Sequence, residues 1–371
     1  MHIMNTNPKI KVAILFGGKS AEHEVSLQSA KSVINAIDKN KYELQLIGID
    51  KSGKWYLNDQ SHYLLNENNP KLIKLNNSNV EVTLIPTDKN SELLNISSGK
   101  TIDYVDVVFP VLHGSFGEDG TIQGMLKLLN IPFVGCSVMG SAMGMDKDVA
   151  KRLWRDAGIA VAKWKCVTKN DLASLDFESV KAELGLPMFV KPANAGSSVG
   201  VSKVTSASEF KTALDEAFLF DRKVLIEESI KGREIEVAVL GNEEVIASVP
   251  GEVIPQDSFY SYKAKYIDEK GALLSAPAQL SESEIKNVQA QAIKAFKVLC
   301  CEGLSRVDFF LKENGDYVLN EINTLPGFTS ISMYPKLWQL SGIGYTELID
   351  RLISLALERH AEETKLKTNY E

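Results

Sequence analysis

Two carboxylates near the C-terminus are placed to face each other across a predicted β-hairpin. Residues 304–323 contain two apolar runs that are typical of strands, and the E-N-G-D between them favours a two-residue turn at Asn314 and Gly315. Pairing outward from that turn sets Asp308 directly opposite Glu321. Opposed side chains have Cβ atoms roughly 5 Å apart, where like charges repel, so this pair requires a cation between its members.

The residues around this pair supply further ligands for such a cation. The same register sets Arg306 opposite Asn323, on the same face of the hairpin. The carboxylates and the Asn323 amide form an all-oxygen set, which suits Mg²⁺ or Mn²⁺ held with phosphate oxygens and does not suit zinc. Arg306 is placed to neutralise a phosphoryl group or an oxyanion. The alternative is a surface hairpin with a local salt bridge between Arg306 and Glu321.

A second candidate site lies in mid-chain, where a loop of small residues follows a lysine. Residues 186–190 predict a buried strand that ends at Lys191, and residues 193–200 (A-N-A-G-S-S-V-G) predict a loop that leads into a second strand. Backbone N–H groups in such a loop approach anions closely, while Ser197 and Ser198 add hydroxyl donors and Lys191 adds a positive charge. A phosphate site is one interpretation, and an ordinary hairpin with a flexible tip is the other.

Two further polar residues follow predicted strands in the N-terminal third. Glu22 comes after the strand at residues 10–16, at the start of a helix, where open α/β sheets bind ligands. A surface carboxylate that complements the helix dipole is the alternative for Glu22. His113 follows the strand at residues 105–111, in the glycine-rich stretch L-H-G-S-F-G-E-D-G. Its position at a strand–loop junction makes it a candidate for ligand contact.

Three features of the second half suit a nucleotide. One helix is predicted over residues 141–157, with Lys147 near its N-terminal end, where a lysine is out of pattern unless a phosphate binds there. Glu227 and Glu234 flank a short linker and suit the amine or the hydroxyls of a nucleotide, although solvated strand ends are the alternative. Residues 257–266 (D-S-F-Y-S-Y-K-A-K-Y) mix aromatic residues with lysines and predict a lid over a site.

Composition limits what these sites can serve. The 371 residues predict two or three domains, of α/β and α+β class because predicted strands and helices alternate. With 41 basic and 48 acidic residues, the net charge is −7, and the absence of a basic tract argues against nucleic-acid and membrane-surface partners. The four cysteines form no C-x-x-C pair, which favours reduced thiols in a cytosolic protein. The polar N-terminus and the absence of a bilayer-length apolar run predict neither a signal peptide nor a membrane span.

Seven segments, in order along nearly the whole chain, resemble the D-alanine–D-alanine ligase family of the ATP-grasp fold. They are G-G-K-S-A-E-H-E-V-S from Gly17, L-H-G-x-x-G-E-D-G-T-I-Q-G from Leu112, Met145-Asp146-Lys147, K-P-A-N-A-G-S-S-V-G from Lys191, the lid at 259–266, Arg306-Val307-Asp308, and E-I-N-T-L-P-G-F-T from Glu321. The resemblance implies a three-domain ATP-grasp architecture. An N-terminal Rossmann-like (preATP-grasp) α/β domain would span 1–140, a central ATP-grasp subdomain 141–231, and a C-terminal subdomain with the hairpin and the lid 232–371.

The resemblance also implies roles for the matching residues. The implied ATP contacts, at the phosphates, adenine and ribose, are Lys147, Lys191, Ser198, Glu227, Glu228, Ile230, Glu234 and Lys265. The implied ligands of two Mg²⁺ ions, with Mn²⁺ as a substitute, are Asp308, Glu321 and Asn323. The implied substrate and catalytic positions are Glu22, Ser197 and Tyr266 around the ammonium of the first D-alanine, His113 near its carboxylate, Arg306 and the Gly327 amide at the oxyanion, and Ser332 at the carboxylate of the second D-alanine.

The implied reaction is the ATP-dependent ligation of two D-alanine molecules through an acyl phosphate, with release of ADP and phosphate. It would supply peptidoglycan precursors in the cytoplasm, and the enzyme would be a homodimer. A D-alanine–D-lactate ligase is an alternative, but the ligases that make D-alanyl-D-lactate replace the lid tyrosine, and Tyr266 is present here. Another ATP-grasp carboxylate–amine ligase would not need Glu22, Ser197, Tyr266 and Ser332 together. A non-catalytic nucleotide-binding module would not explain the opposed carboxylates.

Overall fold

The computed structural model describes residues 8–67, 69–70, 72–76, 78, 80–87, 91–255, 272–329 and 331–367. The predicted lid at 257–266, with Lys265 and Tyr266, lies outside the described residues. Within the described part of the chain, no helix is long and apolar enough to cross a membrane. The fold is mixed α/β, as the alternation of strands and helices predicts, and its three main sheets succeed one another along the chain.

The first sheet has the strand order β3-β2-β1-β9. Its central strand β1 (Ile10–Gly17) pairs in parallel with both neighbours, and residues 12–16 are fully buried, which explains their continuous apolar run. The other elements of this region are β2 (Tyr42–Ile49), β3 (Trp55–Asn58), β9 (Val107–Val111), α1 (His23–Ala36), α2 (Thr121–Leu128), and the small antiparallel strands β4 (Leu64–Leu65), β5 (Lys74–Leu75), β6 (Val82–Pro86), β7 (Ser91–Asn95) and β8 (Lys100–Val105).

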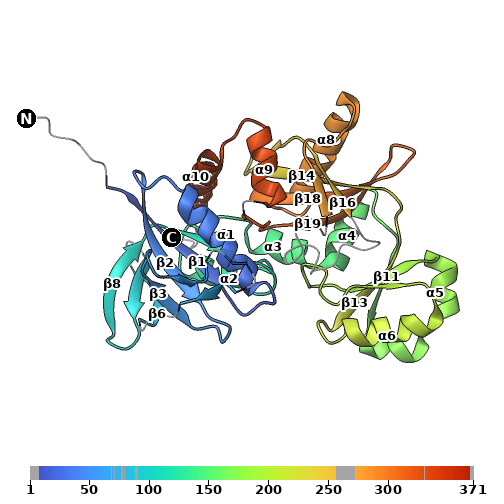
Figure 1. Ribbon diagram of the computed structural model, residues 1–371, viewed down its shortest axis with the longest axis horizontal. Helices are drawn as coiled ribbons and strands as arrows, with labels where there is room; N and C mark the ends of the chain where they lie inside the picture. The colour runs from blue at the N-terminus through green and yellow to red at the C-terminus, as the bar shows by residue number, and fades with distance from the viewer. Residues whose placement is uncertain are drawn as a thin grey trace, which may run out of the picture.

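The second sheet is antiparallel, has the order β10-β13-β11-β12, and packs around a core of its own. In Figure 1 it forms a separate green lobe, with its two helices on the outer side. Its elements are β10 (Trp164–Thr168), the 3₁₀ helix η1 (Lys169–Ser174), α5 (Phe177–Leu184), β11 (Met188–Pro192), β12 (Ser202–Val204), α6 (Ala207–Ala217) and β13 (Lys223–Glu228). Lys191 lies near the end of β11. It comes just before the loop of small residues 193–200, which is called the glycine-rich loop from here on.

The third sheet has the order β17-β16-β14-β18-β19, with β15 paired to β14. Its elements are β14 (Arg233–Gly241), β15 (Ile246–Ala247), β16 (Gly251–Pro255), β17 (Ala272–Ser275), α8 (Glu282–Val298), β18 (Gly303–Leu311), β19 (Tyr317–Asn323), α9 (Met333–Leu340) and α10 (Tyr345–Glu363). Its α10 packs back on the first sheet, where Arg359 donates hydrogen bonds of 2.6 and 2.7 Å to two backbone carbonyls. The first and third regions therefore share one continuous core. Each main sheet falls inside one predicted domain, while the boundaries at 140 and 231 stay predictions.

The single helix predicted over 141–157 is wrong, because two helices occupy this stretch. Helix α3 (Val138–Met145) ends at Asp146, and α4 (Lys147–Asp156) begins after it. The Asp146 carboxylate accepts hydrogen bonds from the N–H groups of Asp148 and Val149, at 3.1 and 3.0 Å. The Asp146 side chain therefore caps α4. The backbone of Asp146 is extended rather than helical, so α3 ends there. Lys147 thereby becomes the first residue of α4.

The predicted two-residue turn of the β18–β19 hairpin is also wrong. Lys312 and Asp316 close a three-residue loop with a 2.9 Å backbone hydrogen bond, and Gly315 adopts a left-handed φ of 87°. The register then shifts by one residue between Asp308 and Phe309, where Asn320 has no partner strand residue. The longer loop and the bulge offset each other. Asp308 consequently lies opposite Glu321, and Arg306 opposite Asn323, as predicted.

Candidate active site

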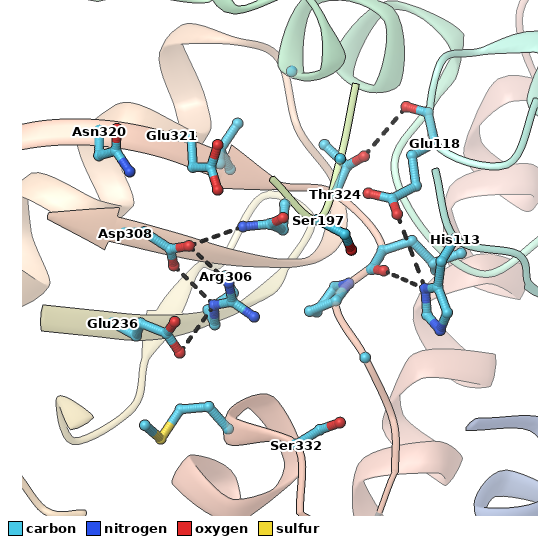
Figure 2. A pocket seen from close by; sticks show the side chains of 18 of the residues that line it. His113, Glu118, Ser197, Glu236, Arg306, Asp308, Asn320, Glu321, Thr324 and Ser332 are labelled. Carbon is cyan, nitrogen blue, oxygen red and sulfur yellow. Dashed lines mark hydrogen bonds and ion pairs between the residues drawn. The ribbon is translucent and has the colours of Figure 1, made fainter. Parts of the chain in front are cut away.

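A single cavity collects side chains from all three regions of the chain. Its lining includes Glu22 and His113 from the first region, Ser197 from the glycine-rich loop, and Asp308 and Glu321 from the hairpin. Figure 2 shows Asp308 and Glu321 on one side of this space and His113 on the other. The cavity also contains the further predicted positions Lys147, Glu234, Arg306, Asn323, Gly327 and Ser332. Residues as far apart in the sequence as Glu22 and Ser332 therefore meet at one site.

Asp308 accepts three hydrogen bonds from two polar neighbours, Arg306 and Asn323. Arg306 donates from Nε to Oδ1 at 2.8 Å and from Nη2 to Oδ2 at 2.7 Å, so the guanidinium binds the carboxylate with two parallel hydrogen bonds. Asn323 donates from Nδ2 to Oδ2 at 3.0 Å. Glu236, on the adjacent strand β14 opposite Asp308, lies 3.1 Å from Arg306 Nε. Arg306 therefore bridges two carboxylates (Figure 2).

Glu321, the carboxylate opposite Asp308, has Lys147 as its nearby positive charge. Lys147 Nζ lies 3.8 Å from Glu321 Oε2 and donates a 2.7 Å hydrogen bond to the Ala195 carbonyl of the glycine-rich loop. In the described part of the chain, no three His, Cys, Asp or Glu side chains are grouped to hold a metal. The predicted set contains only two carboxylates, Asp308 and Glu321, with the Asn323 amide beside them. This all-oxygen set, with phosphate oxygens to complete it, fits Mg²⁺.

A buried ion-pair cluster lies at the base of the glycine-rich loop. Lys191 Nζ is 2.8 Å from Glu227 Oε1, and Lys151 Nζ is 2.9 Å from Glu227 Oε2. Burial alone would raise the pKa of the Glu227 carboxyl, but the two ammonium charges outweigh burial and lower it. Glu227 is therefore an ionised acceptor between two cations. Neither Lys191 nor Glu227 is among the described residues that line the cavity.

Four other described residues are predicted to contact the nucleotide. Glu228 accepts a 2.7 Å hydrogen bond from the Lys163 backbone N–H, so its side chain is used in joining β13 to the segment before β10. Ile230 is half-buried in the link between β13 and β14, and Glu234 lines the cavity from β14. Ser198 has a left-handed φ of 60°, like Ser197 beside it, which turns the loop sharply at these two residues.

Glu22 and Ser197 form a direct contact between the first region and the glycine-rich loop. Ser197 Oγ donates a hydrogen bond to Glu22 Oε1, and Glu22 is only 6% exposed. The loop passes so close that a Cβ on Gly196 would lie 2.7 Å from Glu22 Oε2. A carboxylate held this way on a cavity wall is suited to an ammonium group, and the dipole-complementing surface carboxylate is excluded by its burial.

His113 is neutral and fully engaged. Its Nδ1–H donates to the Leu325 carbonyl at 3.0 Å, which leaves Nε2 to accept from Ser29 Oγ at 2.9 Å. Burial lowers the pKa of His113 to about 4. Nearby Glu118 accepts from the Gly114 N–H at 2.8 Å. Burial, together with the Glu22 carboxylate, raises the pKa of Glu118 to about 8.

Gly327 and Ser332 lie together at the start of α9. Ser332 Oγ accepts a 3.0 Å hydrogen bond from the Thr329 N–H and contacts Thr329 Oγ1 at 2.8 Å. A Cβ on Gly327 would approach Ser332 Oγ to 2.9 Å, so glycine keeps this side of the cavity open. Both residues line the cavity, and Figure 2 shows Ser332 at the start of a helix below Arg306 in that view.

Three residues of the site have no role in the sequence-based assignment. Glu118 lies six residues after Leu112, inside the glycine-rich motif that begins there, and this position in the sequence gives no sign that it faces Glu22. Glu236 follows Glu234 at strand spacing, which places both on one face but does not reveal the contact with Arg306. Lys151 follows Lys147 by one helical turn. That spacing was a usable signal, because it puts both lysines on one face of α4.

Comparisons with known proteins agree with this geometry. Family profiles described as D-ala D-ala ligase N-terminus and C-terminus match residues 11–136 and 153–354. A D-alanine–D-alanine ligase of Oceanobacillus iheyensis is 58% identical over 361 residues, covering 97% of this chain and 99% of that protein. D-alanine–D-alanine ligase A of Escherichia coli is 53% identical over 360 residues, with 97% and 99% covered.

Solved structures resemble the chain over its whole length. The D-alanine–D-alanine ligase from Coxiella burnetii superposes with a TM-score of 0.83 at 38% identity, covering 96% of both chains. The VanG D-Ala:D-Ser ligase from Enterococcus faecalis superposes with a TM-score of 0.82 at 37% identity, covering 94% of this chain and 100% of that one. Similar folds in this set therefore serve different second substrates.

Proposed function

The chain belongs to the D-alanine–D-alanine ligase family, and on that premise we propose how its cavity divides the reaction among the residues described above. The protein is an ATP-grasp enzyme that joins two D-alanine molecules at the expense of ATP, for peptidoglycan synthesis. The observation that carries the assignment of roles is the pair Asp308–Glu321, directly opposed, flanked by Arg306 and Lys147, in the same cavity as Glu22.

The reaction proceeds in two steps. A carboxylate oxygen of the first D-alanine attacks the γ-phosphorus of ATP, a C–O–P linkage forms, and the bond to ADP breaks. The amine nitrogen of the second D-alanine then attacks the acyl carbon, loses a proton as the C–N bond forms, and phosphate leaves with the C–O bond electrons. Phosphorylation supplies the leaving group that a carboxylate lacks, so the residues mainly position reactants and neutralise charge.

Asp308, Glu321 and Asn323 hold the divalent cations, two Mg²⁺ ions with Mn²⁺ as a substitute. Cations held there would supply positive charge to the phosphate oxygens. Arg306 contacts the carboxylates of Asp308 and Glu236 within the cavity, which supports its assignment beside the reacting phosphoryl and acyl oxygens. Arg306 and the Gly327 amide stabilise the oxyanion that forms on the acyl carbon.

The two amino-acid sites use different residues of the same cavity. Glu22 binds the ammonium of the first D-alanine, and Ser197 orients the Glu22 carboxylate through its hydrogen bond. His113 acts there as a neutral wall near the substrate carboxylate, since its two ring nitrogens bind Leu325 and Ser29. Ser332 holds the carboxylate of the second D-alanine. Tyr266 completes the first site by resemblance alone.

The nucleotide lies along the glycine-rich loop. Lys147, Lys191 and Ser198 contact its phosphates, and the family resemblance assigns Lys265 to them as well. Glu227 accepts from the adenine amine, and Glu234 from the ribose hydroxyls. Glu228 and Ile230, which follow Glu227 on the link to β14, offer backbone and apolar contacts to the base.

The decisive experiment is phosphate release from ATP and Mg²⁺ with D-alanine and L-alanine in parallel, with the dipeptide identified by mass. Release with D-alanine only, accompanied by D-alanyl-D-alanine, is the expected result. Release with neither amino acid would overturn the assignment of roles. Offering D-lactate and D-serine with D-alanine separates the alternatives, and we expect the dipeptide of D-alanine to dominate because Tyr266 is present.

The proposed cellular location follows from the substrates. ATP and D-alanine are small molecules, and a cytoplasmic enzyme meets both. The family resemblance favours a homodimer, which sedimentation of the full chain tests directly. A monomer with full activity would overturn the dimer proposal without affecting the reaction.

A further inference from the structure

Lys151 is a charged side chain with no exposed surface. It lies on α4 one turn after Lys147, and its exposed fraction is 0%. A buried ammonium is costly unless a counter-charge and hydrogen bonds compensate for the lost hydration. Its counter-charge is Glu227, whose Oε2 lies 2.9 Å from Lys151 Nζ, and Glu227 is itself only 4% exposed. Because both side chains are buried, this pair does not contribute to the solubility of the surface, and another role must account for it.

Glu227 carries two cations on its two oxygens. Oε1 faces Lys191 at 2.8 Å and Oε2 faces Lys151. The two lysines come from different elements, because Lys191 lies near the end of β11 and Lys151 on α4. The cluster therefore contains one negative and two positive charges. Lys151 balances Glu227 from the side of α4, so the charge of Lys191 remains for an anion.

We propose that Lys151 is a positioning residue for nucleotide recognition, which keeps Glu227 ionised and directed at the adenine amine while Lys191 serves the phosphates. The inference rests on the proposed contact between Glu227 and adenine. It assigns Lys151 no contact with the nucleotide. Lys151 acts on the base through Glu227, and its loss changes which base the site prefers as well as how tightly the site binds phosphate.

The consequence of removing Lys151 follows from charge balance. Glu227 would keep one cation, Lys191, in a site almost closed to water. The carboxylate would then either take up a proton or hold Lys191 more tightly. A protonated Glu227 donates a hydrogen bond where adenine also presents a donor, its amine. A carboxylate drawn towards Lys191 is no longer directed at the adenine amine, and Lys191 no longer serves the phosphates. In both cases the preference for an amine at this position of the base decreases.

The experiment compares the binding of ADP and inosine diphosphate to the full chain by calorimetry, without D-alanine. Inosine diphosphate carries a carbonyl oxygen where ADP carries the amine, and the phosphates are identical. We expect Lys151→Met to reduce the ratio of ADP affinity to inosine diphosphate affinity by about tenfold, the usual scale of a hydrogen bond to a charged group. Lys223→Met is the matched control, because Lys223 lies on β13 with Glu227 but pairs with Asp146, at 2.6 Å. That variant should leave the ratio unchanged.

Two further variants separate the possible failures. Glu227→Gln should reduce the ratio by itself, and the double variant Lys151→Met with Glu227→Gln should match Glu227→Gln alone, because Lys151 acts through Glu227. An unchanged ratio in Lys151→Met beside a reduced ratio in Glu227→Gln would overturn the inference and leave the adenine contact in place. An unchanged ratio in Glu227→Gln would overturn the adenine contact and the inference together. If Lys151→Met does not fold, Lys151→Gln replaces it, with the same expected fall.

Discussion

The guanidinium of Arg306 binds the carboxylate of Asp308 through two parallel hydrogen bonds, of 2.8 and 2.7 Å, two positions apart on β18. The two side chains share one face because strand residues two apart project to the same side. Asp308, the proposed cation ligand, is thus paired with Arg306, the residue proposed to stabilise the oxyanion. Glu236 gives Arg306 a second carboxylate at 3.1 Å, so Arg306 stays anchored when a cation binds Asp308.

Replacing Asp308 with alanine should abolish catalysis and keep the fold. We expect phosphate release to fall by at least about a hundredfold, the scale seen when one group that stabilises transition-state charge is removed. Arg306 retains Glu236, so the melting temperature should change little. Continuous phosphate release and thermal melting check the two parts. Asp316→Ala, in the exposed hairpin loop, is the matched control, and normal turnover by Asp308→Ala would contradict the metal assignment.

The two adjacent loop serines should have separable effects. Ser197→Ala removes the hydrogen bond to Glu22, so we expect the KM for the first D-alanine to rise about tenfold, with the KM for ATP almost unchanged. Ser198→Ala should raise the KM for ATP instead. Initial rates at varied concentrations of each substrate measure both. Equal effects of both variants on both substrates would show that the loop acts as one unit.

Glu118 should make the protein less stable as the pH rises. Its pKa in the folded chain is raised to about 8, from 4.5, so between these values the native state holds a proton that the unfolded chain has lost. The free energy of unfolding then decreases by up to roughly 1.4 kcal/mol per pH unit in that window. Glu118→Gln should remove this decrease. Urea unfolding at several pH values between 5 and 8 tests it, and identical slopes for the two proteins would refute it.

His113 should have the opposite effect, at lower pH. Its pKa in the folded chain is lowered to about 4, from 6.5, so the native imidazole stays neutral while the unfolded one takes up a proton. Its stabilisation is complete above pH 6.5 and is lost as the pH falls toward 4, by up to roughly 1.4 kcal/mol per pH unit. His113→Gln should flatten that part of the curve. His62→Gln, at an exposed position, should not, and a matching change there would count against the prediction.

The sequence alone determined the chemistry of the site. Strand alternation and a hairpin signal placed Asp308 opposite Glu321, and oxygen ligands pointed to Mg²⁺ rather than zinc. That pairing was correct although the predicted turn was wrong, because a three-residue loop and the bulge at Asn320 offset each other. The motifs between Gly17 and Thr329 determined the family, since their residue types and order are local properties that can be read directly.

Only the tertiary structure decided which of these side chains touch. The contact between Glu22 and Ser197 joins residues 175 positions apart, and Glu227 meets Lys151 across two secondary-structure elements. Such contacts depend on how separate sheets pack, which no local pattern specifies. The same holds for the raised pKa of Glu118 and the lowered pKa of His113, because burial and neighbouring charges exist only after the regions have come together.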